Sequence, residues 1–437
     1  MRLPRKFRLT ATVTLLVTAL LGSAACGAAG GSAGDGSGTV NALVLLNPAD
    51  KIVAEKILPE FQKKYPKIKV NWEMVPYAGG YTQKAQLSLA NTKAPFDIVM
   101  WWDQLLPTTQ QFLEPLDGYI KDSKFDLDDF DPAWRDAVTI DGKTYGIPWI
   151  ADLWTFWYRQ DLLKARGVEV PKTPEELLKA CQALTDRSKK QYGYVMLGQR
   201  DPLQVMSWMP WLWANGGEVF DKDWHPQLAS GEAARAGEYW KQLSQCAPPG
   251  SENYLHTDAM TAFASGNAVM GTMGIGWIGA VQQQNPQVAA KISYGGRIPG
   301  TGAANHSAHG WPFVISKHSR NKAAAWTFIS YLTSAESFKT VATNPTGSHV
   351  VMARKTVYND PAVAQVHPWV TQVREVVPYV RPKFNPGLGN PRGWSEIMDE
   401  IALRNSQILA GEKAPGTAYQ EADAALKDKM KTFGYRQ

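Results

Sequence analysis

The stretch Val40-Asn-Ala-Leu-Val-Leu-Leu-Asn-Pro48 joins an apolar run to the start of a helix. Its first seven residues have the length and composition of a buried strand. Asn47 then offers a capping side chain, and Pro48 suits the first turn of a helix. Pro59 is expected to kink that helix. One apolar helical face follows from the spacing of Ala54, Ile57, Leu58 and Phe61.

The same alternation of strands and helices continues along the chain. Strands are predicted at 68–75 and 96–101, with a helix between them at about 81–89. A second cycle contains a strand at 152–158, a helix at 173–184, a strand at 192–197, and helices at about 205–214, 232–245 and 257–264. Strands separated by helices of this length predict an α/β fold with a mainly parallel sheet, wrapped on both faces.

The N-terminal residues are typical of an export signal. Four basic residues precede an uncharged apolar run at 11–21, and small residues lead to Cys26. We interpret residues 1–25 as a signal peptide and residues 26–39, rich in Gly, Ala and Ser, as a flexible tether. The cysteine resembles the lipidated cysteine of bacterial lipoproteins, which implies an exported protein anchored by lipid on the extracytoplasmic face. Ser23 replaces the usual aliphatic residue, so a plain secretory signal stays open.

Charge and composition narrow the classes of function. The net charge is +6, but four of the positive charges lie in the signal, which leaves +2 for the remaining chain. This balance gives no argument for nucleic-acid binding. No later apolar run reaches the length of a membrane span. Roughly 400 residues with 44% hydrophobic content support about two domains with their own cores.

Two cysteines remain after Cys26, and their pairing is open. Cys181 lies in a predicted helix and Cys246 just after another, so they could form a disulfide or stay as two buried thiols. No CxxC motif or Cys/His spacing occurs, and we therefore expect no metal site.

The motif Gly274-Ile-Gly-Trp-Ile-Gly279 fits the GxGxxG pattern of dinucleotide sites. No acidic residue occurs from 280 to 305, where a ribose-binding acid would lie, and Trp277 is too bulky for a backbone that approaches a pyrophosphate. We expect no nucleotide and no other cofactor. No GxSxG or HExxH motif is present. Asp103 and Asp152 could mimic a glycosidase pair, but carboxylates that accept sugar hydroxyls are the preferred interpretation.

Tryptophan gives the strongest compositional indication of a ligand. The chain has 17 tryptophans, and many follow predicted strands, where open α/β sheets bind ligands. These are Trp101, Trp102, Trp149, Trp154, Trp208, Trp211, Trp213 and Trp277. Any single one could be core filler, but an indole offers a flat apolar face and a polar edge, which suits a sugar ring. The set therefore favours sugar binding.

Several stretches resemble the extracellular solute-binding proteins of carbohydrate importers, the family of the maltose- and trehalose-binding receptors. They are 61–70, 94–101, 143–149, 156–162, 268–277 and 315–326. The resemblance implies a periplasmic-binding-protein type II-like fold with two α/β lobes, a ligand cleft and hinge crossovers. Lobe 1 would comprise 40–150 and 310–375, and lobe 2 would comprise 151–309 and 376–437, with crossings near Trp149, near Trp311 and at 374–381.

Strand-end positions and the resemblance together give the expected ligand-binding residues: Asn47, Trp101, Trp102, Asp103, Gln104, Trp149, Asp152, Gln199, Arg200, Trp208, Trp277, Trp311 and Trp394. Met398 stands where some relatives carry Arg. The implied mechanism is lobe closure on a mono- or oligosaccharide by a monomer, which then delivers it to the transmembrane subunits of an ABC importer without catalysis. Two alternatives remain: a receptor for another solute, such as a peptide, polyamine or metal chelate, and a glycoside hydrolase.

Overall fold

The computed structural model describes residues 37–300, 305–351, 353–376, 379–381 and 391–436. The chain divides into residues 1–34 and residues 35–437, and the second unit is the one described below. The predicted signal peptide, Cys26 and the tether up to residue 36 lie outside the described residues. Within the described part, no helix is both long enough and apolar enough to cross a membrane.

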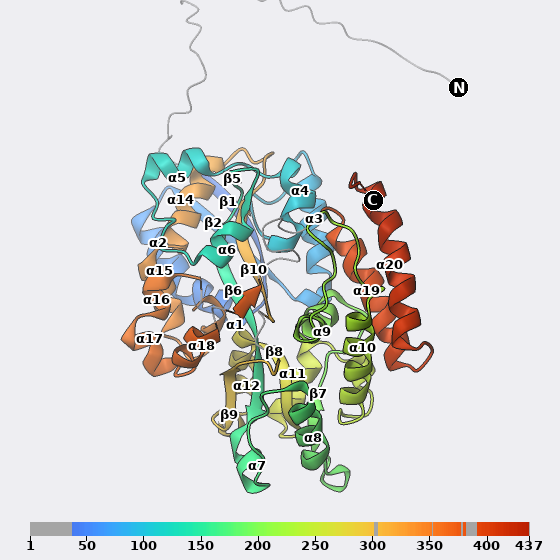
Figure 1. The fold of residues 1–437 in the computed structure, drawn as a ribbon. Coiled ribbons are helices and arrows are strands. Elements are labelled where there is room, and N and C mark those ends of the chain that lie inside the picture. Colours follow the sequence, from blue (N-terminus) through green and yellow to red (C-terminus); the bar gives the residue numbers. More distant parts are fainter. Residues whose placement is uncertain (1–36, 301–304, 352, 377–378, 382–390, 437) are drawn as a thin grey trace, which may run out of the picture. The chain divides into compact units, whose positions relative to one another are not determined.

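A mixed sheet forms the centre of the second unit (Figure 1). Its strands run in the order β2-β1-β3-β10-β6-β8-β7, with β11 beside β10 and β9 beside β6. A separate pair joins β4 to β5. The bounds are β1 (Gly38–Leu45), β2 (Ile68–Val75), β3 (Ile98–Met100), β4 (Thr139–Ile140), β5 (Lys143–Thr144), β6 (Ile147–Arg159), β7 (Tyr192–Val195), β8 (Ala268–Gly274), β9 (Ile292–Gly296), β10 (His306–Ile315) and β11 (Val380–Arg381).

The middle of this sheet corrects the expectation of a mainly parallel sheet. β1 is parallel to β2 and β3, and β7 is parallel to β8, as expected. β10, however, is antiparallel to β3 and to β6, and β6 is antiparallel to β8 and β9. β6 and β10 run in opposite directions, and their register places Ile150 opposite Trp311 and Asp152 opposite His309.

β6 connects two groups of strands. The first half of this 13-residue strand pairs with β10, and Trp154 to Tyr158 pair with β8. The strand is therefore shared between the group around β1 and the group around β7. This arrangement has the form of the predicted interlobe crossing near Trp149 and Trp311, whereas the lobe boundaries themselves stay a prediction. Of the third predicted crossing, residues 377–378 lie outside the described part, and β11 follows them beside β10.

The helices surround these strands. Their bounds are α1 (Pro48–Ile52), α2 (Leu58–Lys64), α3 (Tyr81–Ala90), α4 (Leu106–Thr109), α5 (Asp117–Ser123), α6 (Pro132–Ala137), α7 (Gln160–Ala165), α8 (Pro174–Leu184), α9 (Pro202–Ala214), α10 (Gly231–Ser244), α11 (His256–Ala264), α12 (Ile278–Gln284), α13 (Pro286–Ala289), α14 (Lys322–Leu332), α15 (Ala335–Ala342), α16 (Lys355–Tyr358), α17 (Pro361–Val366), α18 (Val370–Val376), α19 (Trp394–Leu409) and α20 (Pro415–Thr432).

Local chemistry explains where the helices begin. The Asn47 side chain caps α1 by accepting a hydrogen bond from the Asp50 N–H at 3.1 Å, as predicted. Thr173 caps α8 by accepting from the Glu176 N–H at 3.2 Å. Between α1 and α2 the hydrogen bonding becomes π-helical over Val53–Ile57, directly before the turn that contains Pro59. The helix is thus interrupted where proline was expected to disturb it.

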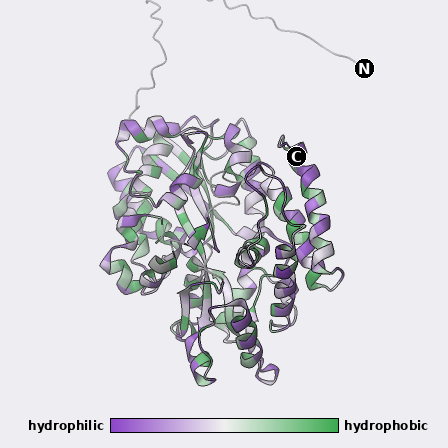
Figure 2. Cartoon of the chain, in the orientation of Figure 1, coloured by the Kyte–Doolittle hydropathy of each residue, from purple (hydrophilic) through white to green (hydrophobic). Residues whose placement is uncertain are grey.

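Burial of β1 on both faces explains the continuous apolar run at residues 40–46. Ala42, Leu43 and Val44 of β1 are all completely buried, so both faces of this strand are covered. Along the outer helices, hydrophobic and hydrophilic residues alternate (Figure 2). That pattern is typical of helices that lay one face on a sheet.

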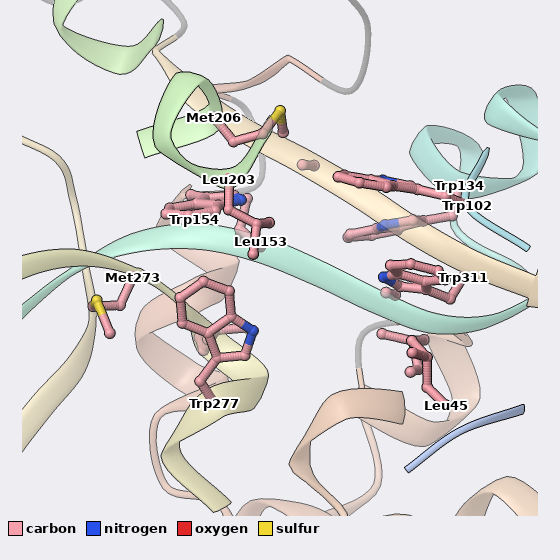
Figure 3. Packing of buried hydrophobic residues seen from close by; sticks show 14 of the residues in the cluster. Leu45, Trp102, Trp134, Leu153, Trp154, Leu203, Met206, Met273, Trp277 and Trp311 are labelled. Atoms are coloured by element: carbon pink, nitrogen blue, oxygen red, sulfur yellow. The ribbon is translucent and has the colours of Figure 1, made fainter. Parts of the chain in front are cut away.

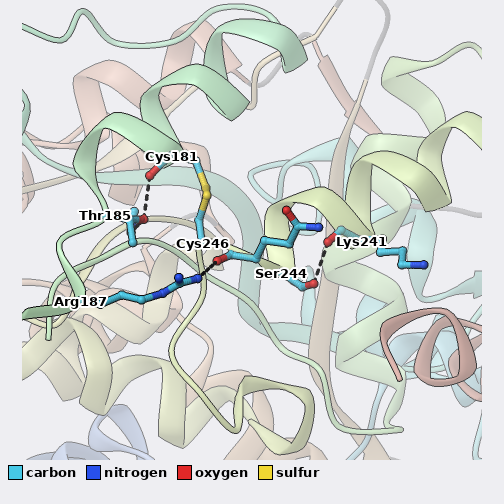
Figure 4. The surroundings of a disulfide bond; sticks show 8 residues. Cys181, Thr185, Arg187, Lys241, Ser244 and Cys246 are labelled. Carbon is cyan, nitrogen blue, oxygen red and sulfur yellow. Dashed lines mark hydrogen bonds between the residues drawn. A yellow bond between two sulfur atoms is a disulfide. The ribbon is translucent and has the colours of Figure 1, made fainter. Parts of the chain in front are cut away.

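A disulfide joins Cys181 in α8 to Cys246 just after α10, with 5.9 Å between their Cα atoms (Figure 4). Thr185 donates to the Cys181 carbonyl at 2.8 Å, and Arg187 donates to the Gln245 carbonyl at 3.0 Å. The structure therefore selects the disulfide from the two alternatives that the sequence left open.

Candidate ligand-binding site

A cavity of about 210 Å³ lies where the end of β1, the middle of β6 and β10, and the helices α9, α11 and α12 meet. It brings together four predicted ligand-binding residues: Asn47, Asp152, Trp277 and Trp311. The other lining residues are Leu45, Leu46, Pro48, Tyr77, Ile150, Leu203, His256, Thr257, Met260, Ala280, His309 and His349. They come from both predicted lobes and from the strands that cross between them.

Asp152 is the buried acid of this cavity, with 1% of its surface exposed. Its Oδ1 accepts a hydrogen bond from the Gly276 N–H at 3.1 Å. Burial raises the pKa of Asp152 to about 7, and the hydrogen bond from Gly276 opposes that rise. The carboxyl group can therefore exchange a proton near neutral pH.

The glycines of the GxGxxG motif are explained by this close packing. A Cβ on Gly274 would lie 2.4 Å from Asp152 Oδ2, and a Cβ on Gly276 would lie 2.3 Å from His349 Cδ2. The motif lets the end of β8 approach a carboxylate and an imidazole. Gly274 and Gly276 therefore have a packing role beside the cavity.

Three histidines line the cavity, and sequence reasoning missed all of them. Burial lowers the pKa of His256 and His349 to about 4 and that of His309 to about 3. They are therefore neutral near pH 7, and a neutral imidazole has one donor and one acceptor nitrogen. His309 Nδ1 accepts from the Trp154 indole N–H at 3.3 Å, which leaves the proton on Nε2, 4.0 Å from Asp152 Oδ2.

One of these histidines could have been found from the sequence. His309 lies two residues before Trp311 on β10, so the two side chains belong to the same face of the strand. His256 opens α11 and His349 lies in a short turn after α15, and neither position carries a sequence pattern that indicates a ligand site.

The indoles of Trp277 and Trp311 form apolar walls of the cavity (Figure 3). The phenol of Tyr77 also lines it. Trp277 contacts Trp154 edge to face, with 5.0 Å between ring centroids. Trp311 stacks on Trp102 at 5.2 Å and 20°. Tyr77 contacts Trp311 edge to face at 6.2 Å. The cavity thus combines aromatic faces with a small number of buried polar groups, as ligand sites commonly do.

Several predicted residues lie behind these walls. Trp102 and Trp394, both about 1% exposed, contact each other with ring centroids 4.7 Å apart, and neither lines the cavity. Asp103 Oδ2 accepts from the Gly310 N–H at 2.7 Å, and Gln104 donates to the Ala308 carbonyl at 3.5 Å. The buried Trp101 indole donates to Thr109 Oγ1 at 2.9 Å. These side chains support the strands that form the cavity.

The remaining predicted residues lie elsewhere. Trp149 packs against Phe313 and Phe338 in the core. Gln199 is exposed, and Arg200 forms a two-point ion pair with Asp399 at 2.8 and 2.6 Å. Trp208, Trp211 and Trp213 lie within α9, the helix predicted at about 205–214, but they are buried in the hydrophobic core and do not line the cavity.

A second hollow, with a volume of about 520 Å³, is larger than the cavity. It lies between β9, α12 and α13 on one side and α17 and α18 on the other, and it contains none of the predicted residues. None of the described residues that line it carries a formal charge. The smaller cavity is the candidate site, because buried ionisable groups and aromatic faces converge there.

Asp221, Asp223 and His225 lie close enough together to hold a metal ion, but none of them lines the cavity. Asp221 Oδ1 already accepts from the N–H groups of Asp223 and His225, both at 2.9 Å. We assign no metal to this surface group.

Comparison with known proteins gives a family and a fold. Residues 46–337 match the model of the bacterial extracellular solute-binding protein family. A mannitol-binding protein of Pseudomonas aeruginosa is 24% identical over 413 residues, which cover 90% of this chain and 93% of that protein. The fold superposes with a TM-score of 0.80 on an ABC transporter solute-binding protein from Agrobacterium radiobacter K84 in complex with ribitol, at 26% identity and over 89% of this chain and 98% of that one. Maltose-bound MalE3 of T. maritima also gives a TM-score of 0.80, at 24% identity, over 89% of this chain and 99% of that chain.

Proposed function

The chain belongs to the bacterial extracellular solute-binding proteins, and from this premise we propose that it is the substrate-binding component of an ABC importer for a sugar or polyol. The observation that carries the proposal is the cavity between the two predicted lobes, where the indoles of Trp277 and Trp311 lie beside Asp152 and three neutral histidines. The mannitol-binding relative and the ribitol complex support the same ligand class.

The chemistry of the cavity suits hydroxyl-rich ligands. Apolar C–H faces of a sugar or polyol can pack on the rings of Trp277 and Trp311. The Asp152 carboxylate accepts hydrogen bonds from hydroxyl groups, and the neutral imidazoles of His256 and His349 can both donate and accept hydrogen bonds. A hydroxyl that lies beside one of these groups thus finds a polar partner, which offsets the loss of its water.

The proposed mechanism is closure of the two predicted lobes, 40–150 with 310–375 and 151–309 with 376–437. The ligand contacts Asn47 from the first lobe and Trp277 from the second, so binding favours the form in which both residues surround it. The closed form then presents the solute to the transmembrane subunits of the importer. The protein acts as a monomer, and the solute leaves it unchanged.

Export is expected of this family, and we propose that Cys26 adds a lipid anchor. The anchor, with residues 27–39 as a tether, would hold the protein on the extracytoplasmic face of the membrane. Metabolic labelling with a fatty-acid analogue tests the anchor, since the label is expected on the full chain and absent from a Cys26→Ala variant.

A glycoside hydrolase needs two carboxylates, one on each side of the glycosidic bond that it cleaves. Of the two candidates, Asp152 lines the cavity, whereas Asp103 accepts a hydrogen bond from the backbone of Gly310 and does not line it. This placement favours capture of the solute over its cleavage.

A thermal-shift screen tests the ligand class. Mannitol, ribitol, glucose and maltose are compared with a dipeptide and with spermidine, each at millimolar concentration. A ligand that binds only the folded state raises the melting temperature, because the stabilisation grows as RT ln(1 + [L]/Kd). We expect a shift with at least one sugar or polyol. A shift with the peptide or the amine alone would overturn the proposed ligand class.

A further inference from the structure

The cavity is closed at one end by a fixed indole. Trp311 stacks on Trp102, and Trp102 in turn contacts Trp394. In Figure 3, Trp134, Trp102 and Trp311 lie one above another, with Leu45 below Trp311. The space behind Trp311 is therefore filled by other side chains, and a ligand has no room to continue in this direction.

Two tyrosines hold the Trp311 ring in place. Tyr77 contacts it edge to face at 6.2 Å, and Tyr81 does so at 5.9 Å. Tyr81 is itself fixed, because its hydroxyl donates to the backbone carbonyls of Leu43 and Met100. Only 6% of the Trp311 surface is exposed. A ring that is packed on this many sides acts as a rigid wall.

The indole of Trp277 forms a second packed wall of the cavity. Trp277 contacts Trp154 at 5.0 Å and His256 at 5.3 Å, and it is also 6% exposed. The cavity as a whole has a volume of about 210 Å³, which is below the roughly 300 Å³ at which pockets for drug-sized ligands begin. This volume favours a molecule of one sugar unit over one of two.

The charges around the cavity give a second restriction. Among the described residues that line it, Asp152 is the only carboxylic acid, and there is no lysine or arginine. A phosphate or carboxylate on the ligand would meet no cation and would lie close to Asp152 in a region that excludes water. Such an unpaired buried charge is strongly unfavourable.

We propose that the cavity takes one short, uncharged polyhydroxylated molecule, a free monosaccharide or an alditol, and that Trp311 is the residue that excludes a second sugar unit. This inference rests on the proposed function and makes it narrower. In this proposal a single side chain of β10, that of Trp311, limits the length of the ligand.

The test is a calorimetric titration of the wild-type protein with mannitol, ribitol, glucose, maltose, glucose 6-phosphate, a dipeptide and spermidine. At least one of the three uncharged monomers is expected to bind at least tenfold more tightly than maltose, and glucose 6-phosphate is expected not to bind. If maltose binds as tightly as the best monomer, the length limit is wrong while the proposed function stands. If no sugar or polyol binds and a peptide or amine does, the proposed function itself is wrong.

A Trp311→Ala variant tests the role of the indole. Removal of the ring opens space toward Trp102, so the ratio of maltose to monomer affinity is expected to rise at least tenfold. Trp326→Ala is the matched control, since Trp326 is also 6% exposed but packs on Tyr119 and Phe125 outside the cavity, and its ratio should stay that of the wild type. If Trp311→Ala does not fold, Trp311→Leu gives the same comparison. An unchanged ratio in a folded Trp311 variant would overturn the assignment.

Discussion

Asp152 Oδ1 and the backbone nitrogen of Gly276 lie 3.1 Å apart, and this hydrogen bond links β6 to the turn that carries Trp277. Asp152 belongs to the strand shared by both groups of the sheet, whereas Gly276 follows β8. The contact fixes the position of the acid relative to the indole, so one interaction aligns the polar and the apolar parts of the cavity.

The variant Asp152→Asn is expected to weaken ligand binding at least tenfold. The amide has about the same size but only one acceptor oxygen, so either the Gly276 N–H or a ligand hydroxyl loses its partner, at a cost of about 1–3 kcal/mol. Calorimetry with the best monomeric ligand measures the change. Asp103→Asn is the control, because Asp103 does not line the cavity, and it should keep the wild-type affinity. If Asp103→Asn weakened binding and Asp152→Asn did not, the wrong acid would have been placed in the site.

The variant Gly276→Ala is expected to lower both stability and ligand affinity. Its new Cβ would lie 2.3 Å from the His349 ring and 3.0 Å from the His349 Cα, so ring and backbone would have to move. Overpacking of this kind costs about 1–3 kcal/mol. Gly279→Ala, in the same motif, is the control, because its Cβ would come no closer than 3.2 Å to Ser348 Oγ and the Thr346 carbonyl. Urea unfolding should separate the two variants, and equal stabilities would contradict the packing role of Gly276.

Loss of the disulfide is expected to lower stability without changing the site. Cys181 and Cys246 are 65 residues apart in sequence, and closing a loop of this length stabilises a fold by about 4 kcal/mol in the chain-entropy model. Neither cysteine lines the cavity. A Cys181→Ala/Cys246→Ala protein should therefore melt at a lower temperature and bind its ligand with unchanged affinity. An unchanged melting temperature would argue against the bond.

The stability of the protein should depend on pH through Asp50. This acid lies in α1 and is fully buried, the Trp149 indole donates to it at 3.2 Å, and burial raises its pKa from 3.8 to about 8. Because the folded state holds the proton more tightly than the unfolded state, the stabilisation is complete below about pH 4 and is lost as the pH rises through about 8.

The variant Asp50→Asn removes this titration. Its free energy of unfolding should fall less between about pH 5 and about pH 9 than that of the wild type, by at least about 1 kcal/mol. Urea denaturation at both pH values gives the comparison, and Asp122→Asn, at an exposed position of α5, serves as the control. Parallel pH dependence in wild type and Asp50→Asn would contradict the assignment.

The fold was predictable from the sequence to the extent that local patterns determine it. The strands and helices up to Trp101 follow from apolar runs and capping residues such as Asn47, which act through neighbours in sequence. The antiparallel pairing of β6 with β10 was not predictable from spacing, because it joins Asp152 to His309 across more than 150 residues of chain.

The site was predictable only in part, for a similar reason. Trp277 and Trp311 line the cavity, whereas Trp101, directly after β3, and Trp149, near the start of β6, turn into the core. The alternation of side chains along a strand decides between these two outcomes, and its phase depends on which neighbours pack on each face. His349 reaches the site from a turn that no local pattern connects to it.

The most direct test of the proposed function is the affinity of Trp277→Ala for the tightest ligand among mannitol, ribitol and glucose, measured by calorimetry. Gln283→Ala, an exposed change in the larger hollow, is measured beside it. Capture in the cavity predicts one saturable site in the wild type, at least a tenfold loss in Trp277→Ala, and no loss in Gln283→Ala. Wild-type affinity in Trp277→Ala together with a loss in Gln283→Ala would place the ligand elsewhere and contradict the account.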